Sequence, residues 1–268
     1  MTSLTLPGPL PLGVARGGTE LRQFFRNKEQ VVFTFSLPAV LMILLGSILD
    51  GPTALEGVTS GQLLAAGMIG SGIVSTSFNS IATGVTADRE TGALKRLRGT
   101  PMPRAAYFIG KVVMVLAIGL VETVLLVTVA ALFFGVKLPA TGEKWLTFVW
   151  VSLLGITACT LCGIAFSSLA KSGRSGPAVV TPVAIVLQFI SGVFFQYTEL
   201  PDWMRGIASV FPLKWMTQGM RSVFLPDSFA AQEPSGAWQH GLIALVLAGW
   251  IVLAGVLCLL TFRWTERD

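Results

Sequence analysis

The fold is decided by residues 86–101, which read TADRETGALKRLRGTP and separate two long apolar runs. Acidic residues lie early in this stretch and basic residues lie near its end, which is the distribution that a helix dipole favours. Gly99 can end such a helix in a left-handed conformation, and the proline that follows prevents its continuation. Leu94 and Leu97 share the only small apolar face. We therefore expect a short helix over residues 86–99 that needs a partner surface, either lipid headgroups or another protein.

The composition of the chain points to a membrane protein. Of its 268 residues, 53% are hydrophobic and only 12% are charged, and the mean hydropathy is +0.72. A soluble domain carries about 25% charged residues, so most of this chain is expected to lie in lipid. The formal net charge of +5 could suggest a nucleic-acid partner. Its distribution along the chain favours membrane orientation instead, and we expect no nucleic acid.

Apolar segments of membrane-spanning length follow one another along the chain. We therefore predict an all-α integral membrane protein with six transmembrane helices. The predicted spans are residues 31–49, 63–85, 105–134, 145–170, 178–197 and 242–262. A signal peptide is the alternative for the first segment, but its apolar run is too long and it lacks a small-residue cleavage site.

The remaining segments are predicted to lie at the membrane surface. Residues 1–30 form a proline-containing cytoplasmic tail and an interfacial elbow helix, and residues 31–268 form one six-span domain. An ordinary solvated flank before the first span is the alternative for residues 14–30. Residues 198–240 alternate apolar and polar positions, which predicts two short extracellular interfacial helices separated at Pro212.

The basic residues fix the orientation of the predicted spans. Six spans place both termini on one side of the membrane. With the termini in the cytoplasm, fourteen of the nineteen Lys and Arg residues also lie on the cytoplasmic side. The positive-inside rule therefore places residues 86–99 in the cytoplasm.

Small and polar residues concentrate in the second predicted span. Ser71 and Ser75 belong to a stripe of small residues with a four-residue repeat, which lets two helices approach closely. Routine packing and a polar wall of a substrate route are both open for this stripe. For a route, we expect Ser71, Ser75 and Phe78 to face Gln188 and Phe195, which are seven residues apart and would share a face of the fifth span.

Glu122 is the only carboxylate predicted to lie inside a span. An intramembrane acid is costly and is a functional-site hypothesis by default. The alternative is a protonated or hydrogen-bonded contact between helices, which the lack of a second buried acid favours. Cys159 and Cys162 lack a second pair of ligands, and His240 is the sole histidine, so we predict no metal site.

The sequence contains no pattern of an ATP-binding loop, a metalloprotease or a nucleophile elbow. We therefore predict no catalytic residue and no cofactor bound by this chain. An integral membrane enzyme and a structural or sensory membrane protein are the rival classes. A neighbouring gene for an ATPase subunit would distinguish transport from both.

Ten residues in and after the polar stretch carry a family resemblance. They are Arg89, Glu90, Gly92, Leu94, Leu97, Thr100, Pro101, Arg104, Gly110 and Lys111. Together with the order and hydropathy of the whole chain, they resemble the cytoplasmic loop of ABC-2 type transport permeases. The nearest subgroup is that of drug-resistance exporters similar to the daunorubicin permease.

This resemblance implies the permease subunit of an ABC exporter in a bacterial plasma membrane. It implies a homodimer, or a pair with a similar subunit, bound to two separate ATPase subunits that hold ATP and magnesium. Residues 86–99 would be the coupling helix, and the first seven of the ten residues would contact the ATPase. The apolar lining suggests a hydrophobic drug or lipid as the substrate, and a polysaccharide or glycolipid is the alternative.

Overall fold

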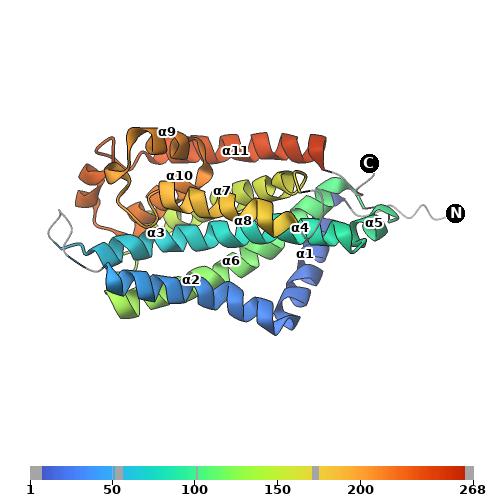
Figure 1. The fold of residues 1–268 in the computed structure, drawn as a ribbon, viewed down its shortest axis with the longest axis horizontal. Coiled ribbons are helices and arrows are strands. Elements are labelled where there is room, and N and C mark those ends of the chain that lie inside the picture. Colours follow the sequence, from blue (N-terminus) through green and yellow to red (C-terminus); the bar gives the residue numbers. More distant parts are fainter. Residues whose placement is uncertain (1–7, 50, 52–56, 101, 171–174, 263–268) are drawn as a thin grey trace.

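The computed structural model of the chain describes residues 8–49, 51, 57–100, 102–170 and 175–262. The regular elements among these residues are helices, and most of them follow the long axis of the molecule (Figure 1). Four are long and apolar enough to cross a membrane. They are α2 (Lys28–Ile48), α6 (Arg104–Phe134), α7 (Gly142–Phe166) and α11 (His240–Thr261). The all-α class is confirmed, and these four helices coincide with the first, third, fourth and sixth predicted spans.

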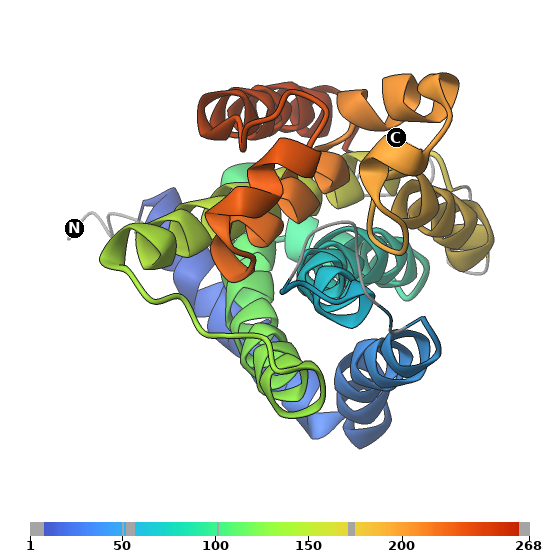
Figure 2. The same ribbon diagram turned by 90° about the vertical axis from the view of Figure 1, so that its left-hand side faces the viewer.

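The segment predicted as the second span is a helical rod with an irregular turn inside it. It consists of α3 (Ser60–Val74), the π-turn η1 (Ser75–Asn79) and α4 (Ser80–Glu90). A capping box begins the rod, because the Thr59 hydroxyl accepts from the Gln62 amide and the Gln62 side chain accepts from the Thr59 amide. Most of α3 is buried, and other helices surround it in the view from the end of the molecule (Figure 2).

The prediction for the fifth span, residues 178–197, is wrong at its C-terminal end. α8 (Ser175–Ile190) ends earlier, and Gly192 follows with a φ of +76°. Glycine adopts this left-handed conformation without the steric cost that a β-carbon adds, so the chain turns away from the helix axis here. Phe195 lies beyond the turn. Gln188 and Phe195 therefore do not share a helical face, contrary to the prediction from their spacing.

The N-terminal helix begins inside the segment predicted to be an irregular tail. α1 (Pro9–Arg26) packs along α6, and two glycines permit the close approach. A β-carbon on Gly13 would lie 2.5 Å from Cγ2 of Ile109, and one on Gly17 would also clash with α6. Asn27 then leaves the helical conformation, and its side chain caps α2. One face of α1 thus packs on protein, and the interfacial position of its other face stays a prediction.

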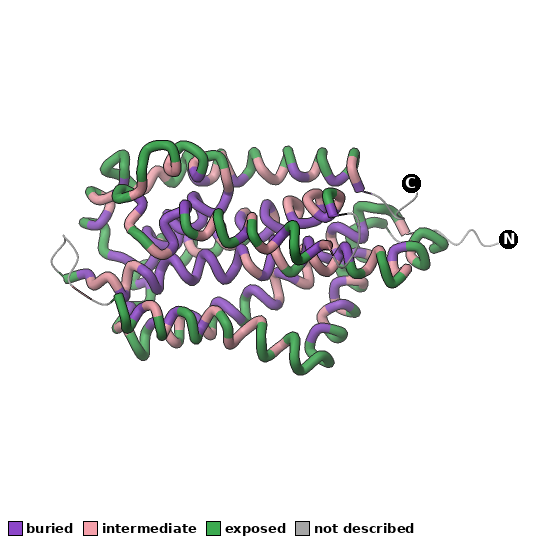
Figure 3. The backbone as a smooth tube through the Cα atoms, viewed as in Figure 1, coloured by how far each residue is buried: buried purple, intermediate pink, exposed green. Residues whose placement is uncertain are grey.

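Four short helices form the connection between α8 and α11. They are η2 (Tyr197–Glu199), α9 (Asp202–Val210), α10 (Pro212–Phe224) and η3 (Asp227–Gln232). α9 exposes apolar side chains that include Trp203. All thirteen residues of α10 are buried, mainly against α3 and α7 (Figure 3). The prediction of an interfacial helix is therefore wrong for α10, because the whole helix is buried and its polar side chains bond to other protein groups.

The loops gather at two opposite ends of the molecule. α5 (Ala93–Arg98) and the C-terminal end of α11 lie at one end, and α9 lies at the other (Figure 1). The end that contains α5 carries the stretch predicted to face the cytoplasm.

Candidate functional site

The polar stretch forms two helices and not the single helix predicted over residues 86–99. α4 ends at Glu90, and α5 begins at Ala93 after Gly92, which has a φ of +72°. Gly99 has a φ of −73° and is not the left-handed residue that was expected. The turn falls at Gly92 because this glycine can adopt the left-handed conformation and end α4.

Three residues of this stretch anchor it to the bundle. Leu94 is fully buried in the hydrophobic core, and Leu97 is half-buried against the same core. The Arg89 guanidinium donates to the carbonyl oxygen of Ser167, just after α7, at 3.1 Å. Leu94 is therefore not available to enter a pocket on a partner, contrary to the expectation that both leucines would do so.

Eight other residues of the stretch form an exposed surface, on which three of the four charged side chains are basic. The exposed residues are Ala87, Glu90, Thr91, Lys95, Arg96, Arg98, Gly99 and Thr100. Pro101, which was also expected to contact a partner, lies outside the described residues. We call this set the α4–α5 surface.

A buried ion cluster ties the polar stretch to two other helices. The Lys111 ammonium on α6 lies 2.9 Å from Oε2 of Glu20 on α1 and 3.0 Å from Oδ2 of Asp88 on α4. Arg16 lies 2.8 Å from the other Glu20 oxygen. The side chains of Lys111 and Glu20 are only 8% and 5% exposed. Asp88 is 32% exposed, and its contact with the buried Lys111 ammonium is the link through which a displacement of α4 would reach α1 and α6.

A polar cavity of about 430 Å³ extends from this ion cluster between α1, α2, α4 and α6. Its walls contain Arg16, Glu20, Asp88 and Lys111, and also Thr76 of the π-turn. The cavity thus links the cluster to the middle of the helical rod.

Glu122 lies beside Thr76 and is fully buried. The Thr76 hydroxyl donates to Oε2 of Glu122, whereas Oε1 has no hydrogen-bond partner among the described residues. Gly72 leaves room for the carboxyl group, because a β-carbon there would lie 2.9 Å from Oε1. This geometry is the hydrogen-bonded contact between helices that was one of the two readings of Glu122, and it lies at a π-turn, a feature frequent at functional sites.

The five residues proposed for a substrate route are not gathered on one surface of the described chain. Phe78 lines an apolar cavity, to which none of the other four contributes. Ser71 is 3% exposed, and Ser75 and Gln188 are half-buried. Phe195 is 46% exposed beyond the end of α8. The burial of Ser71 agrees with the packing interpretation of the small-residue stripe.

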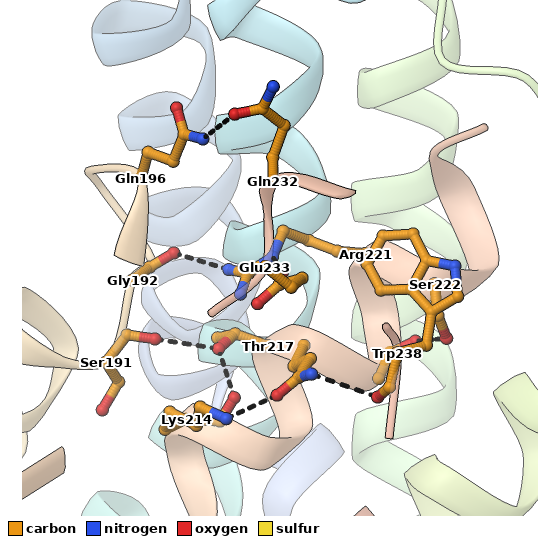
Figure 4. A network of polar contacts seen from close by, with 12 residues as sticks. Ser191, Gly192, Gln196, Lys214, Thr217, Arg221, Ser222, Gln232, Glu233 and Trp238 are labelled. Atoms are coloured by element: carbon orange, nitrogen blue, oxygen red, sulfur yellow. Dashed lines mark hydrogen bonds and ion pairs between the residues drawn. The ribbon is translucent and has the colours of Figure 1, made fainter. Parts of the chain in front are cut away.

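A second polar network lies at the opposite end of the molecule, around α10 (Figure 4). The Arg221 guanidinium lies 2.7 Å from Oε1 of Glu233 and donates to the Gly192 carbonyl oxygen at 2.9 Å. The Thr217 hydroxyl donates to the Ser191 carbonyl oxygen at 2.9 Å. These contacts attach α10 to the turn that follows α8.

Lys214 begins the same network and is 3% exposed. Its ammonium donates to Oε1 of Gln218 at 2.5 Å and lies 3.5 Å from the centre of the Trp215 ring. Burial lowers the Lys214 pKa from 10.5 to about 8. No prediction from the sequence included this network. A signal was present, since Lys214, Gln218 and Arg221 follow helical spacing and place three polar groups on one face.

Comparison with known proteins gives one family and several relatives. The sequence profile described as "ABC-2 type transporter" matches residues 18–225. The chain is 25% identical over 211 residues to "Inner membrane transport permease YadH" of Escherichia coli (strain K12), covering 77% of this chain and 80% of that protein. It is 21% identical over 144 residues to "Probable multidrug ABC transporter permease YbhR" of the same strain, covering 54% of this chain and 38% of that protein.

Proposed function

Because the chain belongs to the ABC-2 type transporter family, we propose that it is the membrane-spanning permease subunit of an ABC exporter. It moves a hydrophobic drug or a lipid-like molecule outward, using ATP that separate ATPase subunits bind with magnesium and hydrolyse. The relatives are named as transport permeases, which favours transport over an integral membrane enzyme. The single observation that carries the proposal is the exposed α4–α5 surface. The burial of Leu94 in the core and the hydrogen bond from Arg89 to Ser167 hold this surface on the bundle.

The proposed topology has six spans in a bacterial plasma membrane with both termini in the cytoplasm. The rod α3–η1–α4 and the shorter apolar helix α8 join the four long helices as the second and fifth spans. The excess of basic residues in the loops of the α5 end supports this orientation.

The α4–α5 surface is proposed to bind a cleft of the ATPase. Glu90 is exposed at the end of α4 and can pair with a cation or with backbone amides of the partner. Five further residues are proposed to contact the ATPase or to maintain the conformation of this surface: Arg89, Gly92, Leu97, Thr100 and Pro101. Closure of two ATPase subunits would displace α4, and the Lys111 ion cluster would carry this displacement to α1 and α6.

A second permease subunit, in a homodimer, is proposed to complete the substrate route. The exposed apolar side chains of α8 and the turn after it, including Val186, Phe189 and Phe195, support an apolar contact or lining there. Gln188 lies among them and is half-buried. An apolar surface of this kind suits a hydrophobic substrate, while a polysaccharide or glycolipid would call for more polar and aromatic groups.

The proposal is tested by co-expression with an ABC ATPase subunit of the same organism, first with any that is encoded beside this gene, and assay of the complex in nanodiscs. We expect ATP hydrolysis that lipids or amphiphilic drugs stimulate and that Glu90→Ala reduces. A complex that never forms, with a neighbouring ATPase that is active alone, would refute the coupling.

Cysteine labelling tests the topology in a variant that lacks the three native cysteines. Cysteines at Thr141 and Ser235 should react with an impermeant reagent on intact cells, and a cysteine at Thr91 only after permeabilisation. All three positions are exposed, whereas Glu233 is unsuitable because it is buried against Arg221. Labelling at Thr91 on intact cells would overturn the topology.

A further inference from the structure

An apolar cavity of about 360 Å³ separates α8 from the paired helices α7 and α11. Its lining includes Phe78, Cys162, Ala184 and Ala254, and no charged residue among those described contributes to it. α7 and α11 pack closely on each other, whereas α8 packs on α4, η1, α9 and α10. The cavity is therefore the space left where α8 stands away from α7 and α11.

The cavity is about as deep as one leaflet of a bilayer. α11 lines it with Trp250, Ala254, Leu257 and Thr261, which follow one helical face. The eleven helical steps from Trp250 to Thr261 span about 16 Å of α-helix. Half of the ~30 Å hydrocarbon core of a bilayer is about 15 Å.

The two ends of the cavity differ in polarity. Ser168 and Thr261 lie at the C-terminal ends of α7 and α11, the end of the molecule that contains α5 (Figure 1). Their hydroxyls donate to backbone carbonyls of their own helices and keep acceptor capacity. Phe211 and Pro212 line the cavity beside Trp250 and are apolar. The cavity is thus polar at its end near α5 and apolar at its end near Trp250.

We propose that this cavity holds one acyl chain of a membrane phospholipid from the leaflet on the α5 side. An acyl chain is uncharged, has the length of one leaflet and carries its polar group at one end, and the cavity has each of these properties. Exposed apolar side chains of α11, such as Leu253, continue from the cavity onto the outer surface of the bundle. The site requires only that the chain lies in a bilayer, and it does not depend on what is transported.

The bound chain has a structural consequence. It contacts Phe78 of the π-turn, Phe166 of α7 and Leu187 of α8, so it joins the central rod to α8 across a gap that protein does not fill. α8 is thereby held by a lipid on the side where direct helix contact is missing.

The proposal is tested with the whole protein in nanodiscs that contain phospholipids with a photoreactive diazirine on the acyl chain. A diazirine near the carbonyl should crosslink near Ser168 and Thr261, and one near the terminal methyl should crosslink near Leu187 and Trp250. Both should exceed the labelling of the exposed Phe33 on α2. Equal crosslink maps for the two probes, or no excess over α2, would overturn the assignment.

Variants provide an independent measurement. Ala184→Phe and Ala254→Phe place bulk in the cavity and should reduce the crosslinking of α8 several-fold. Val252→Phe adds the same side chain on the outward face of α11, where Val252 is 67% exposed, and should leave crosslinking unchanged. Equal crosslinking in all three variants, each with a native gel-filtration profile, would contradict the proposal. Complete displacement of the probe by a compound that stimulates ATP hydrolysis would make the cavity a substrate site and would also refute it.

Discussion

The ammonium group of Lys111 lies 2.9 Å from a carboxylate oxygen of Glu20, and both side chains are buried between α1 and α6. Asp88 adds a second carboxylate to the same ammonium from the end of α4. The three helices therefore meet at one cation. This contact makes the N-terminal helix part of the bundle and gives the polar stretch a mechanical connection to α6.

Removal of the shared cation should be more damaging than removal of one of its partners. Lys111→Met leaves Asp88 without this cation and Glu20 with Arg16 alone, and the loss of one member of a buried ion pair typically costs about 3–5 kcal/mol. Asp88→Asn leaves the Lys111–Glu20 pair intact and should cost less. Thermal unfolding in detergent gives the ranking, with Lys95→Met on the exposed face of α5 as the control. A larger loss for Asp88→Asn would show that the cluster is not centred on Lys111.

Gly92→Ala should disturb the angle between α4 and α5 without a steric clash. No atom lies within 4 Å of the added β-carbon, but the φ of +72° is costly for alanine, by about 1–2 kcal/mol. We expect weaker co-purification of the ATPase with a small change in thermal stability. Gly84→Ala is the matched control, because that site is equally open and has no positive φ. Equal co-purification of both variants would remove Gly92 from the coupling contact.

Substitutions at Leu94 and Glu90 should affect different properties, thermal stability in the first case and coupling to ATP hydrolysis in the second. Leu94→Ala creates a cavity in the core and should cost about 2–5 kcal/mol. Glu90→Ala changes an exposed residue and should leave the unfolding temperature unchanged while it lowers substrate-stimulated ATP hydrolysis. The two measurements are differential scanning fluorimetry and an ATPase assay of the complex. Normal stimulation in Glu90→Ala would argue against a role for this carboxylate.

The contact between Thr76 and Glu122 should appear as an energetic coupling. Thr76→Val leaves the buried carboxyl group without its hydrogen-bond donor, which costs about 1–3 kcal/mol. Thr76→Val combined with Glu122→Leu should cost less than the sum of the single changes, because both partners are then apolar. Unfolding free energies of the four proteins form the double-mutant cycle. Additive effects would mean that the contact contributes nothing to stability.

The lowered pKa of Lys214 should make the protein more stable as the pH rises. Between about 8 and 10.5 the unfolded chain keeps a proton on this lysine that the folded chain has released, so a higher pH favours the folded state. From pH 7.5 to 9.5 the gain should reach roughly 2 kcal/mol, using 1.36 kcal/mol for each pH unit of difference. This range stays below the titration of Tyr197, whose pKa burial raises from 10.0. Lys214→Met should have a flatter profile, and an identical slope in that variant would refute the assignment.

The sequence predicted the helical class and the long spans because hydrophobic length is a local property. It failed where the chain ends a helix inside an apolar run. Residues 191–197 carry no charge and include Val193, Phe194 and Phe195, and only Gly192 marks the turn. Similarly, Gly92 divides a stretch whose charge order fits one continuous helix.

The sites were harder to predict, since they depend on which helices become neighbours. An amphipathic pattern predicts a helix with one solvent-exposed face, but the polar face of α10 is buried and its Arg221 contacts Glu233 and Gly192. The spacing of Leu94 and Leu97 is the same whether they contact a partner or the bundle itself. Only tertiary packing buries Leu94 more completely than Leu97. The ion cluster joins residues 20, 88 and 111, which no local pattern connects.

The π-turn also sets the rotational phase of the rod. On α6, Lys111 and Glu122 are eleven residues apart and therefore lie within about 20° of the same azimuth. The facing positions on the rod, Gly72 and Asp88, are sixteen residues apart, and a regular α-helix would rotate them about 160° from each other. The extra residue of the π-turn reduces this angle by about 100°, so Gly72 and Asp88 can both face α6. The length of this segment is thereby constrained in one direction: deletion of one residue from Ser75–Asn79 would leave a regular α-helix with about the same angle between Gly72 and Asp88, whereas insertion of one more residue would turn Asp88 away from Lys111 while Gly72 kept its place beside Glu122.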